Sequence, residues 1–68
     1  MGEYNEQAIQ MALAFLQTLD SGIFTISKLQ AYLNVGFITV GKIVDELEER
    51  GYIKPAPYYG IGMLEVVR

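Results

Sequence analysis

The chain has 68 residues, and its eight acidic against five basic side chains give a formal net charge of −3 at neutral pH. A single small domain is expected, because a chain of about 60 residues buries only roughly 60% of its unfolded surface. The sequence contains no cysteine and no histidine, which excludes disulfides, thiolate metal sites and histidine-dependent catalytic triads. We therefore expect a non-catalytic binding domain that uses no metal or cofactor.

The N-terminal part shows no pattern of export or membrane insertion. Its longest apolar stretch, residues 8–16, is interrupted by Gln10 and is too short to span a bilayer. No basic leader precedes an apolar run, so we expect no secretory signal. The sequence thus favours a cytoplasmic protein with neither a membrane nor a small-molecule partner. Residues 1–3 are interpreted as a disordered or vector-derived start.

The first predicted element is an amphipathic helix over residues 4–19 with Asn5 as its N-cap. Its apolar side chains cover an arc of about 200° on a helical wheel. That arc is wider than a one-sided surface helix needs, so either two layers pack on it or part of it faces a partner, such as a second copy of the chain. Residues 20–22 end the helix, with Gly22 suited to a positive φ.

Two further helices are predicted after a short strand. Residues 23–26 are β-branched or aromatic, which is typical of a strand. Ser27 is the expected N-cap of a helix over residues 28–33, and residues 34–36 form a turn signal. A third helix is predicted over residues 37–50, with an i, i+4 ion pair between Glu46 and Arg50. Its predicted inward face consists of Phe37, Val40, Ile43, Val44 and Leu47.

The C-terminal part predicts two strands joined by a long loop. Gly51 stands where a left-handed helix cap is expected, and residues 52–54 and 63–67 have strand character with Ile53, Leu64 and Val66 inward. The intervening residues 55–62 are rich in turn formers. The order of elements is that of a winged helix-turn-helix, an α+β fold of three helices plus a small antiparallel sheet with a wing. One such domain fills residues 1–68.

From residue 29 onward the sequence resembles the C-terminal gamma domain of the FtsK/SpoIIIE family of bacterial DNA translocases. The family's stretch Leu-Gln-Arg-x-Leu-x-Ile-Gly-Tyr corresponds here to LQAYLNVGF at residues 29–37, and its apolar pair, acid, Glu and Gly pattern corresponds to residues 43–53. Residues 4–9 are similar to the family's Tyr-Asp-Glu-Ala-Val opening, and residues 64–67 to its last strand. The resemblance implies a winged helix that binds DNA. It implies no ATPase, since the chain has no Gly-rich phosphate loop.

The departures from the family pattern fall on the residues that read DNA. Where the family has Asn-Arg-Ala-Ala-Arg, this chain has ITVGK at residues 38–42, and only Lys42 keeps a positive charge. The matched positions are those that set the fold. The resemblance therefore supports a winged helix more strongly than it supports the family's own sequence-specific recognition.

The predicted DNA contacts lie on the opening turns of the third helix, because this part of a helix-turn-helix enters the major groove. Thr39 offers a hydrogen bond to a base edge, Ile38 an apolar contact to a thymine methyl, and Lys42 a charge for a phosphate or a guanine. The sequence pI near 4.6 is low for a DNA-binding domain, so we expect a dimer or larger assembly on double-stranded DNA. The remaining candidates are Gly41, for close backbone approach, and Lys28, Lys54, Tyr58 and Tyr59, for backbone and wing contacts.

The alternative is a winged helix that binds a protein, for instance one encoded by a phage or mobile element. Ile38 on the recognition face favours this interpretation, as do the aromatic and apolar residues in and beside the wing, Tyr58, Tyr59, Ile61 and Met63. The acidic residues 45–49 point in different directions along the helix, and we expect them to form a solvated face and not a metal site.

Overall fold

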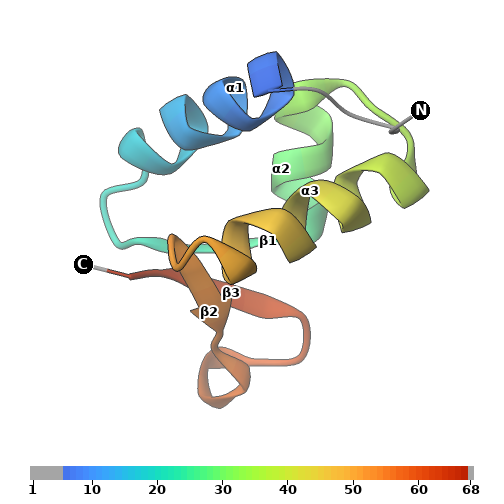
Figure 1. Cartoon of the computed structure of the whole chain (residues 1–68). Coiled ribbons are helices and arrows are strands. Elements are labelled where there is room, and N and C mark those ends of the chain that lie inside the picture. The colour runs from blue at the N-terminus through green and yellow to red at the C-terminus, as the bar shows by residue number, and fades with distance from the viewer. Residues whose placement is uncertain (1–5, 68) are drawn as a thin grey trace.

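The computed structural model describes residues 6–67. Over these residues the chain forms three α-helices, a three-stranded sheet and one turn of 3-10 helix (Figure 1). This confirms the predicted α+β class and is compatible with a winged-helix arrangement. The predicted N-cap Asn5 and the predicted start at residues 1–3 lie outside the described residues. In chain order the elements are α1 (Glu6–Gln17), β1 (Ile23–Thr25), α2 (Ile26–Leu33), α3 (Phe37–Glu49), β2 (Ile53–Pro55), η1 (Pro57–Tyr59) and β3 (Met63–Val66).

The sheet is antiparallel, and its central strand is the last one in the chain. The strand order is β1-β3-β2, with Phe24 opposite Leu64 and Lys54 opposite Glu65. Pro55 lies in the edge strand β2, where a residue without an N–H disturbs the sheet least. The β2–β3 hairpin and its loop, residues 55–62, form the wing, which Figure 1 shows extending to the opposite side of the molecule from α1.

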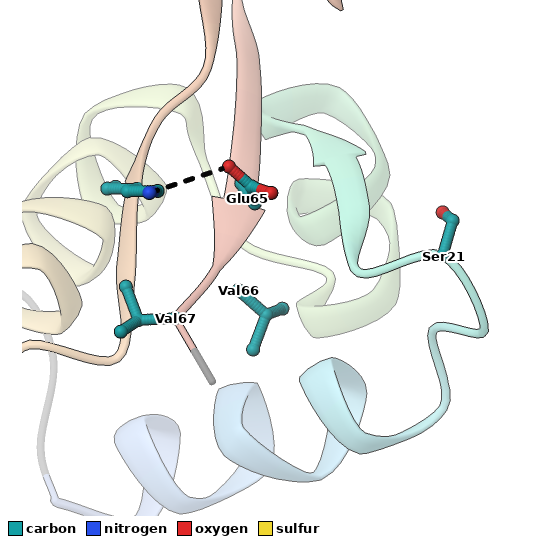
Figure 2. Close-up of a pocket in the computed structure, with 5 residues that line it drawn as sticks. Ser21, Glu65, Val66 and Val67 are labelled. Atoms are coloured by element: carbon teal, nitrogen blue, oxygen red, sulfur yellow. Dashed lines mark ion pairs between the residues drawn. The ribbon is translucent and has the colours of Figure 1, made fainter.

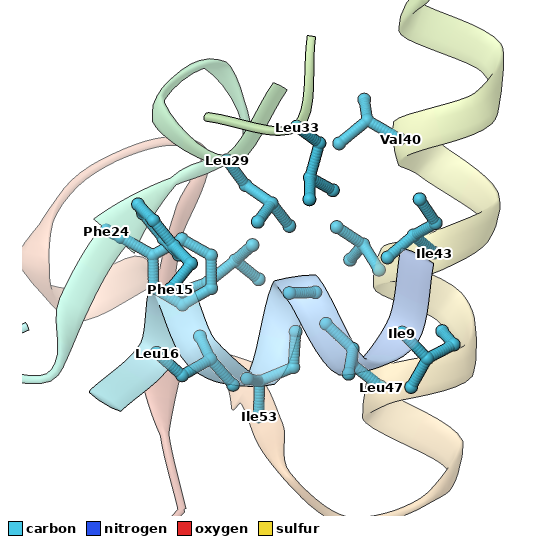
Figure 3. Packing of buried hydrophobic residues seen from close by; sticks show 13 residues of the cluster. Ile9, Phe15, Leu16, Phe24, Leu29, Leu33, Val40, Ile43, Leu47 and Ile53 are labelled. Atoms are coloured by element: carbon cyan, nitrogen blue, oxygen red, sulfur yellow. The ribbon is translucent and has the colours of Figure 1, made fainter. Parts of the chain in front are cut away.

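The core is one cluster to which all three helices and the sheet contribute. Figure 3 shows side chains from α1, α2 and α3 converging on Phe24 and Ile53 of the sheet. Phe15 of α1 meets Phe24 edge-on, with ring centroids 5.6 Å apart. The largest fully buried side chains are Phe24, Ile9, Leu29, Ile43, Leu47 and Val40.

The wide apolar arc of α1 is largely used inside the domain. Ile9, Ala12, Phe15 and Leu16 are buried, while Met11 remains 43% exposed. The arc is wide because α1 covers both the other helices and the sheet, so two layers pack on it. Internal packing thus accounts for the buried part of the arc, and contact of its exposed part with a second copy stays a prediction.

The boundary between β1 and α2 differs from the prediction. Thr25, and not Ser27, is the N-cap: its backbone is extended, and its Oγ1 accepts a hydrogen bond from the N–H of Lys28 at 3.3 Å. Thr25 is thus both the last residue of β1 and the N-cap of α2, and Ile26 is the first helical residue. The helix ends as the turn signal predicts, at Asn34 with a left-handed φ of 56°.

The predicted glycine cap of α3 is confirmed. Gly51 has a φ of 85°, its N–H donates to the carbonyl of Glu48, and the N–H of Tyr52 donates to the carbonyl of Leu47. This pair of bonds is a Schellman motif, which satisfies the last helical carbonyls and reverses the chain toward β2. Gly22, with a φ of 77°, likewise has the predicted positive φ between α1 and β1.

An ion-pair cluster joins the end of α3 to the first turn of α1. The predicted pair of Arg50 with Glu46 is present at 2.7 Å, and the same guanidinium donates to both carboxylate oxygens of Glu6 at 2.9 and 3.1 Å. The hydrogen bonds from Arg50 hold the pKa of Glu6 below its usual value. The Arg50–Glu6 ion pair therefore adds to the free energy of unfolding at pH values above the ordinary carboxyl pKa. This contribution is lost as the pH falls through the lowered pKa of Glu6.

Phe37 was expected on the inward face of α3 and is instead 73% exposed. It is the first residue of the helix, directly after the exposed Gly36, and Figure 1 shows this end of α3 extending past α2. The buried stripe begins one turn later, at Val40. Helical spacing places Phe37 in line with the stripe, but no other part of the described core lies opposite it.

The difference between Phe37 and Ile43 is testable by urea unfolding. We expect Ile43→Ala to lower the free energy of unfolding by about 2–5 kcal/mol, because it leaves a cavity in the core. Phe37→Ala should change it by less than about 0.5 kcal/mol, as for other exposed sites. Equal losses for the two variants would mean that Phe37 is packed in solution.

Candidate nucleic-acid interface

The buried stripe of α3 fixes which residues of that helix face outward. Val40, Ile43, Val44 and Leu47 pack into the core. Consequently Ile38 is 70% exposed and Lys42, Asp45 and Glu49 are also exposed, whereas Thr39 and Gly41 are half-buried beside them. The outward face of the helix therefore carries Ile38 and Lys42, with Thr39 and Gly41 at its flanks. Four of the eight candidate contacts, Ile38, Thr39, Gly41 and Lys42, therefore lie together on its opening turns.

Gly41 has no evident packing role. A side-chain Cβ built at this position would meet no heavy atom within 4 Å. A glycine inside a helix costs roughly 1 kcal/mol relative to alanine. Because nothing in the described fold requires a side chain to be absent here, the effect of the glycine is to leave a low point on the flank of the helix beside Ile38. A backbone that is accessible in this way suits close approach by a ligand.

Charge is unevenly distributed along the chain. Residues 21–44, which span β1, α2 and the opening turns of α3, contain Lys28 and Lys42 and no acidic residue. The acids instead gather on the last turns of α3, where four of them stand in residues 45–49. Residues 21–44 therefore carry only positive formal charge, although the last turns of α3 and the chain as a whole are negative.

In the wing, the predicted contacts Lys54 and Tyr58 are joined to an acid. The Nζ of Lys54 lies 3.8 Å from Oε1 of Glu65, its cross-strand neighbour, and the hydroxyl of Tyr58 donates to the same oxygen. Figure 2 shows the ion pair beside a shallow pocket that Ser21, Val66 and Val67 also line. Because Glu65 compensates its charge, Lys54 offers a phosphate less attraction than the sequence alone predicts.

The two wing tyrosines lie against each other. The rings of Tyr58 and Tyr59 are 4.8 Å apart at 43°, and both remain largely exposed. The hydrogen bond to Glu65 raises the pKa of Tyr58 above its usual value, and the adjacent negative charge acts in the same direction. The pair thus forms an aromatic surface in the wing, where Tyr58 is held by its contact with Glu65.

Two exposed residues near these sites were not assigned to the DNA interface by the sequence. Phe37 extends the apolar surface next to Ile38, and Ile61 stands fully exposed at the tip of the wing. The sequence feature that indicates an exposed Phe37 is its place as the first helical residue after a glycine. The signal for Ile61 is its position between two glycines in a loop that lacks charge.

The described residues contain no group of three or more acidic side chains placed to hold a metal ion. Among residues 6–67, none of the helices combines the length and the apolar character needed to cross a membrane. No family model, curated protein or solved structure matches the chain.

The contact between Tyr58 and Glu65 can be checked by following tyrosine ionisation in the ultraviolet spectrum. We expect Glu65→Gln to lower the pKa of one tyrosine, because it removes the charge that opposes formation of the tyrosinate. Tyr58→Phe should remove the tyrosine ionisation that Glu65→Gln shifts, and Tyr59→Phe should leave that ionisation in place. A titration curve of Glu65→Gln that superimposes on the parent curve would show that the contact does not form in solution.

Proposed function

We propose that this domain binds double-stranded DNA by placing the opening turns of α3 in the major groove. The observation that carries the proposal is the surface of these turns: a cationic Lys42 faces outward, a polar Thr39 lies on one flank, and a glycine that packing does not require lies on the other. Major-groove readout uses this combination of a hydrogen-bonding side chain, a cation and close backbone approach. The resemblance to the FtsK/SpoIIIE gamma domain supports the same proposal.

In this mode Thr39 and Ile38 contact base edges, while Lys42 and Lys28 neutralise phosphates. So few cations give a shallow salt dependence, since each phosphate contact contributes roughly −0.9 to the slope of log affinity against log salt. We therefore propose that a dimer or larger assembly acts on DNA in the cytoplasm. Such a domain serves as a small regulator or as the DNA-recognition part of a translocase-like protein.

A helix-surface variant separates binding from stability. We expect Gly41→Ala to raise the free energy of unfolding by about 0.5–1 kcal/mol, because alanine is the better helix former and the site is open. The same variant should weaken binding to a mixed-sequence duplex, measured by fluorescence anisotropy, because the new methyl group occupies the low point of the surface. A stabilised Gly41→Ala protein that binds as tightly as the parent would remove the main support for the proposal.

The two lysines supply a matched charge test. We expect Lys42→Gln to weaken duplex binding by about tenfold at ~50 mM salt and to reduce the salt slope by about one. Lys54→Gln should have a smaller effect, because Lys54 lies in the wing and not on the opening turns of α3. The melting temperature should stay unchanged in both variants. A loss confined to Lys54→Gln would place the wing and not α3 at the DNA backbone.

Protein binding is the second candidate, and a specific observation favours it. Phe37 and Ile38 stand side by side in the sequence and are both about 70% exposed at the start of α3. Adjacent exposed apolar and aromatic side chains are typical of the centres of protein interfaces. In this case the parent should bind no duplex at ~50 mM salt and should form a defined complex that Ile38→Glu abolishes.

A further inference from the structure

The first residue of α3 is an aromatic side chain that the domain's own core does not use. Phe37 is 73% exposed, more than any other aromatic residue of the described chain, and the adjacent Ile38 is 70% exposed. Apolar surface contributes to the stability of a fold only when it leaves water, so this pair adds nothing as it stands. Two large apolar side chains exposed side by side indicate a contact outside the domain.

An apolar groove lies between the C-terminal half of α1 and the end of the sheet. Its volume is about 220 Å³, and none of the described residues that line it is charged: Leu13, Leu16, Gln17, Tyr52, Val66 and Val67. Tyr52 and Val67 remain 41% and 46% exposed. Since an apolar cavity of about 150 Å³ accommodates benzene, this groove has room for the ring of one phenylalanine.

The walls of the groove are held by the fold. The N–H of Val67 donates to the carbonyl of Tyr52 at 2.9 Å, and Val66 pairs with Ile53 in the sheet. Leu16 is a buried member of the core. A groove built on such elements is preformed, so little conformational freedom is lost when a side chain enters it.

The exposed pair and the groove lie at opposite ends of α3. Phe37 is the first residue of this 13-residue helix, whereas Tyr52 follows its last turn, so about 20 Å of helix separates them at 1.5 Å per residue. Figure 1 shows β3, which ends at Val66, finishing on the side of the molecule opposite the first turn of α3. A chain therefore cannot place Phe37 in its own groove, but a second copy can.

The charges near the two ends are complementary. Lys42 is exposed on the opening turns of α3. At the other end, the exposed Asp20 follows the groove residue Gln17 by three positions, and the exposed Glu49 precedes Tyr52 by three. Two copies that meet head to tail bring the cation of one near the acids of the next, whereas two like ends repel each other. The charge pattern therefore favours a second copy in this orientation.

We propose that copies of this chain associate head to tail, with Phe37 of one copy seated in the groove between α1 and the sheet of the next. Each copy then uses its two ends on two different neighbours, so the assembly is open-ended or closes into a ring. One inserted side chain and its surroundings make a smaller contact than the roughly 800 Å² per partner of a standard interface. The assembly is accordingly reversible, with a Kd between roughly 1 µM and 1 mM.

The contact itself does not require DNA binding, and only one consequence rests on the proposed function. Because Phe37 adjoins Ile38, a neighbouring copy seated on it covers the opening turns of α3, which are proposed to enter the major groove. The next copy and the duplex then compete for one surface. The head-to-tail form therefore holds chains with their DNA face covered, and it is distinct from the assembly proposed on DNA.

Sedimentation velocity of two variants, alone and mixed, tests the contact. Phe37→Ser removes the inserted ring, and Val67→Glu places a charge in the groove. The sedimentation coefficient of the parent should rise with concentration, and each variant alone should associate about tenfold more weakly or less. A 1:1 mixture should form a dimer that grows no further, because the intact Phe37 of one variant meets the intact groove of the other and the remaining two ends are blocked.

Matched variants control for folding and for a general loss of aromatic surface. Tyr59→Ser removes a ring that is also largely exposed, but in the wing, and should assemble as the parent does. Phe37→Leu should keep most of the association, since leucine also fills an apolar groove. Tyr52→Ser is a second groove variant and should replace Val67→Glu in the mixture with the same result. The melting temperatures show that each variant is folded.

The outcomes separate this inference from the proposed function. A parent that stays monomeric up to about 1 mM overturns the inference, as does a Phe37→Ser protein that assembles like the parent. A mixture that stays monomeric while the parent assembles also overturns it. If the parent assembles but binds no duplex, the proposed function fails and the head-to-tail contact stands. Excess duplex should dissolve the parent's assembly, and an assembly that persists on saturating duplex would refute the competition.

Discussion

The apolar stripe of α3 is the constraint on which the surface of this domain depends. Ile43 and Leu47 are completely buried, and with Val40 and Val44 they lock the rotation of the helix about its own axis. Adjacent residues of a helix are separated by 100° of rotation, so turning the stripe by one position would carry Lys42 into the core. A small domain has no spare stability to meet that cost. The outward face of the helix is thus a direct consequence of its inward one.

The acidic character of the chain has a similar structural origin. Glu46 and Glu6 share the guanidinium of Arg50, so part of the negative charge serves to join α1 to the end of α3. Glu65 has a comparable role in the sheet, beside Lys54 and Tyr58. These acids lie where they hold elements together, while residues 21–44 remain free of acid. The overall charge is therefore a poor guide to the charge of residues 21–44.

The sequence predicts the order and type of the elements because their signals are local. Helical spacing, the left-handed Asn34 and the glycine caps at Gly22 and Gly51 each depend on a few neighbouring residues. The choice of Thr25 over Ser27 as N-cap could not be predicted, since both residue types cap helices well and the sheet decides which one is extended. Helical periodicity also cannot show where the neighbouring elements end. It therefore predicts Phe37 on the inward face, although no neighbouring element covers this residue.

Hydrophobic periodicity carries no information about contacts between residues that are far apart in the sequence. The pairing of Glu6 with Arg50 joins positions 44 residues apart, and the contact of Tyr58 with Glu65 depends on a 3-10 turn that the loop composition does not specify. For the site, the sequence predicts that Ile38 and Lys42 of α3 are exposed, as the structure shows, while their contact with DNA stays a prediction. It does not reveal that the charge of Lys54 is compensated, because that depends on the strand register.

The central position of β3 affects the order in which the domain is completed during synthesis. Both β1 and β2 pair only with residues 63–66, so neither has a strand partner until that segment has emerged from the ribosome. Until then the aromatic face of Phe24 and the side chain of Ile53 lack their sheet environment, although the three helices have already been made. Closure of the sheet therefore waits for β3, the strand that both of the others require.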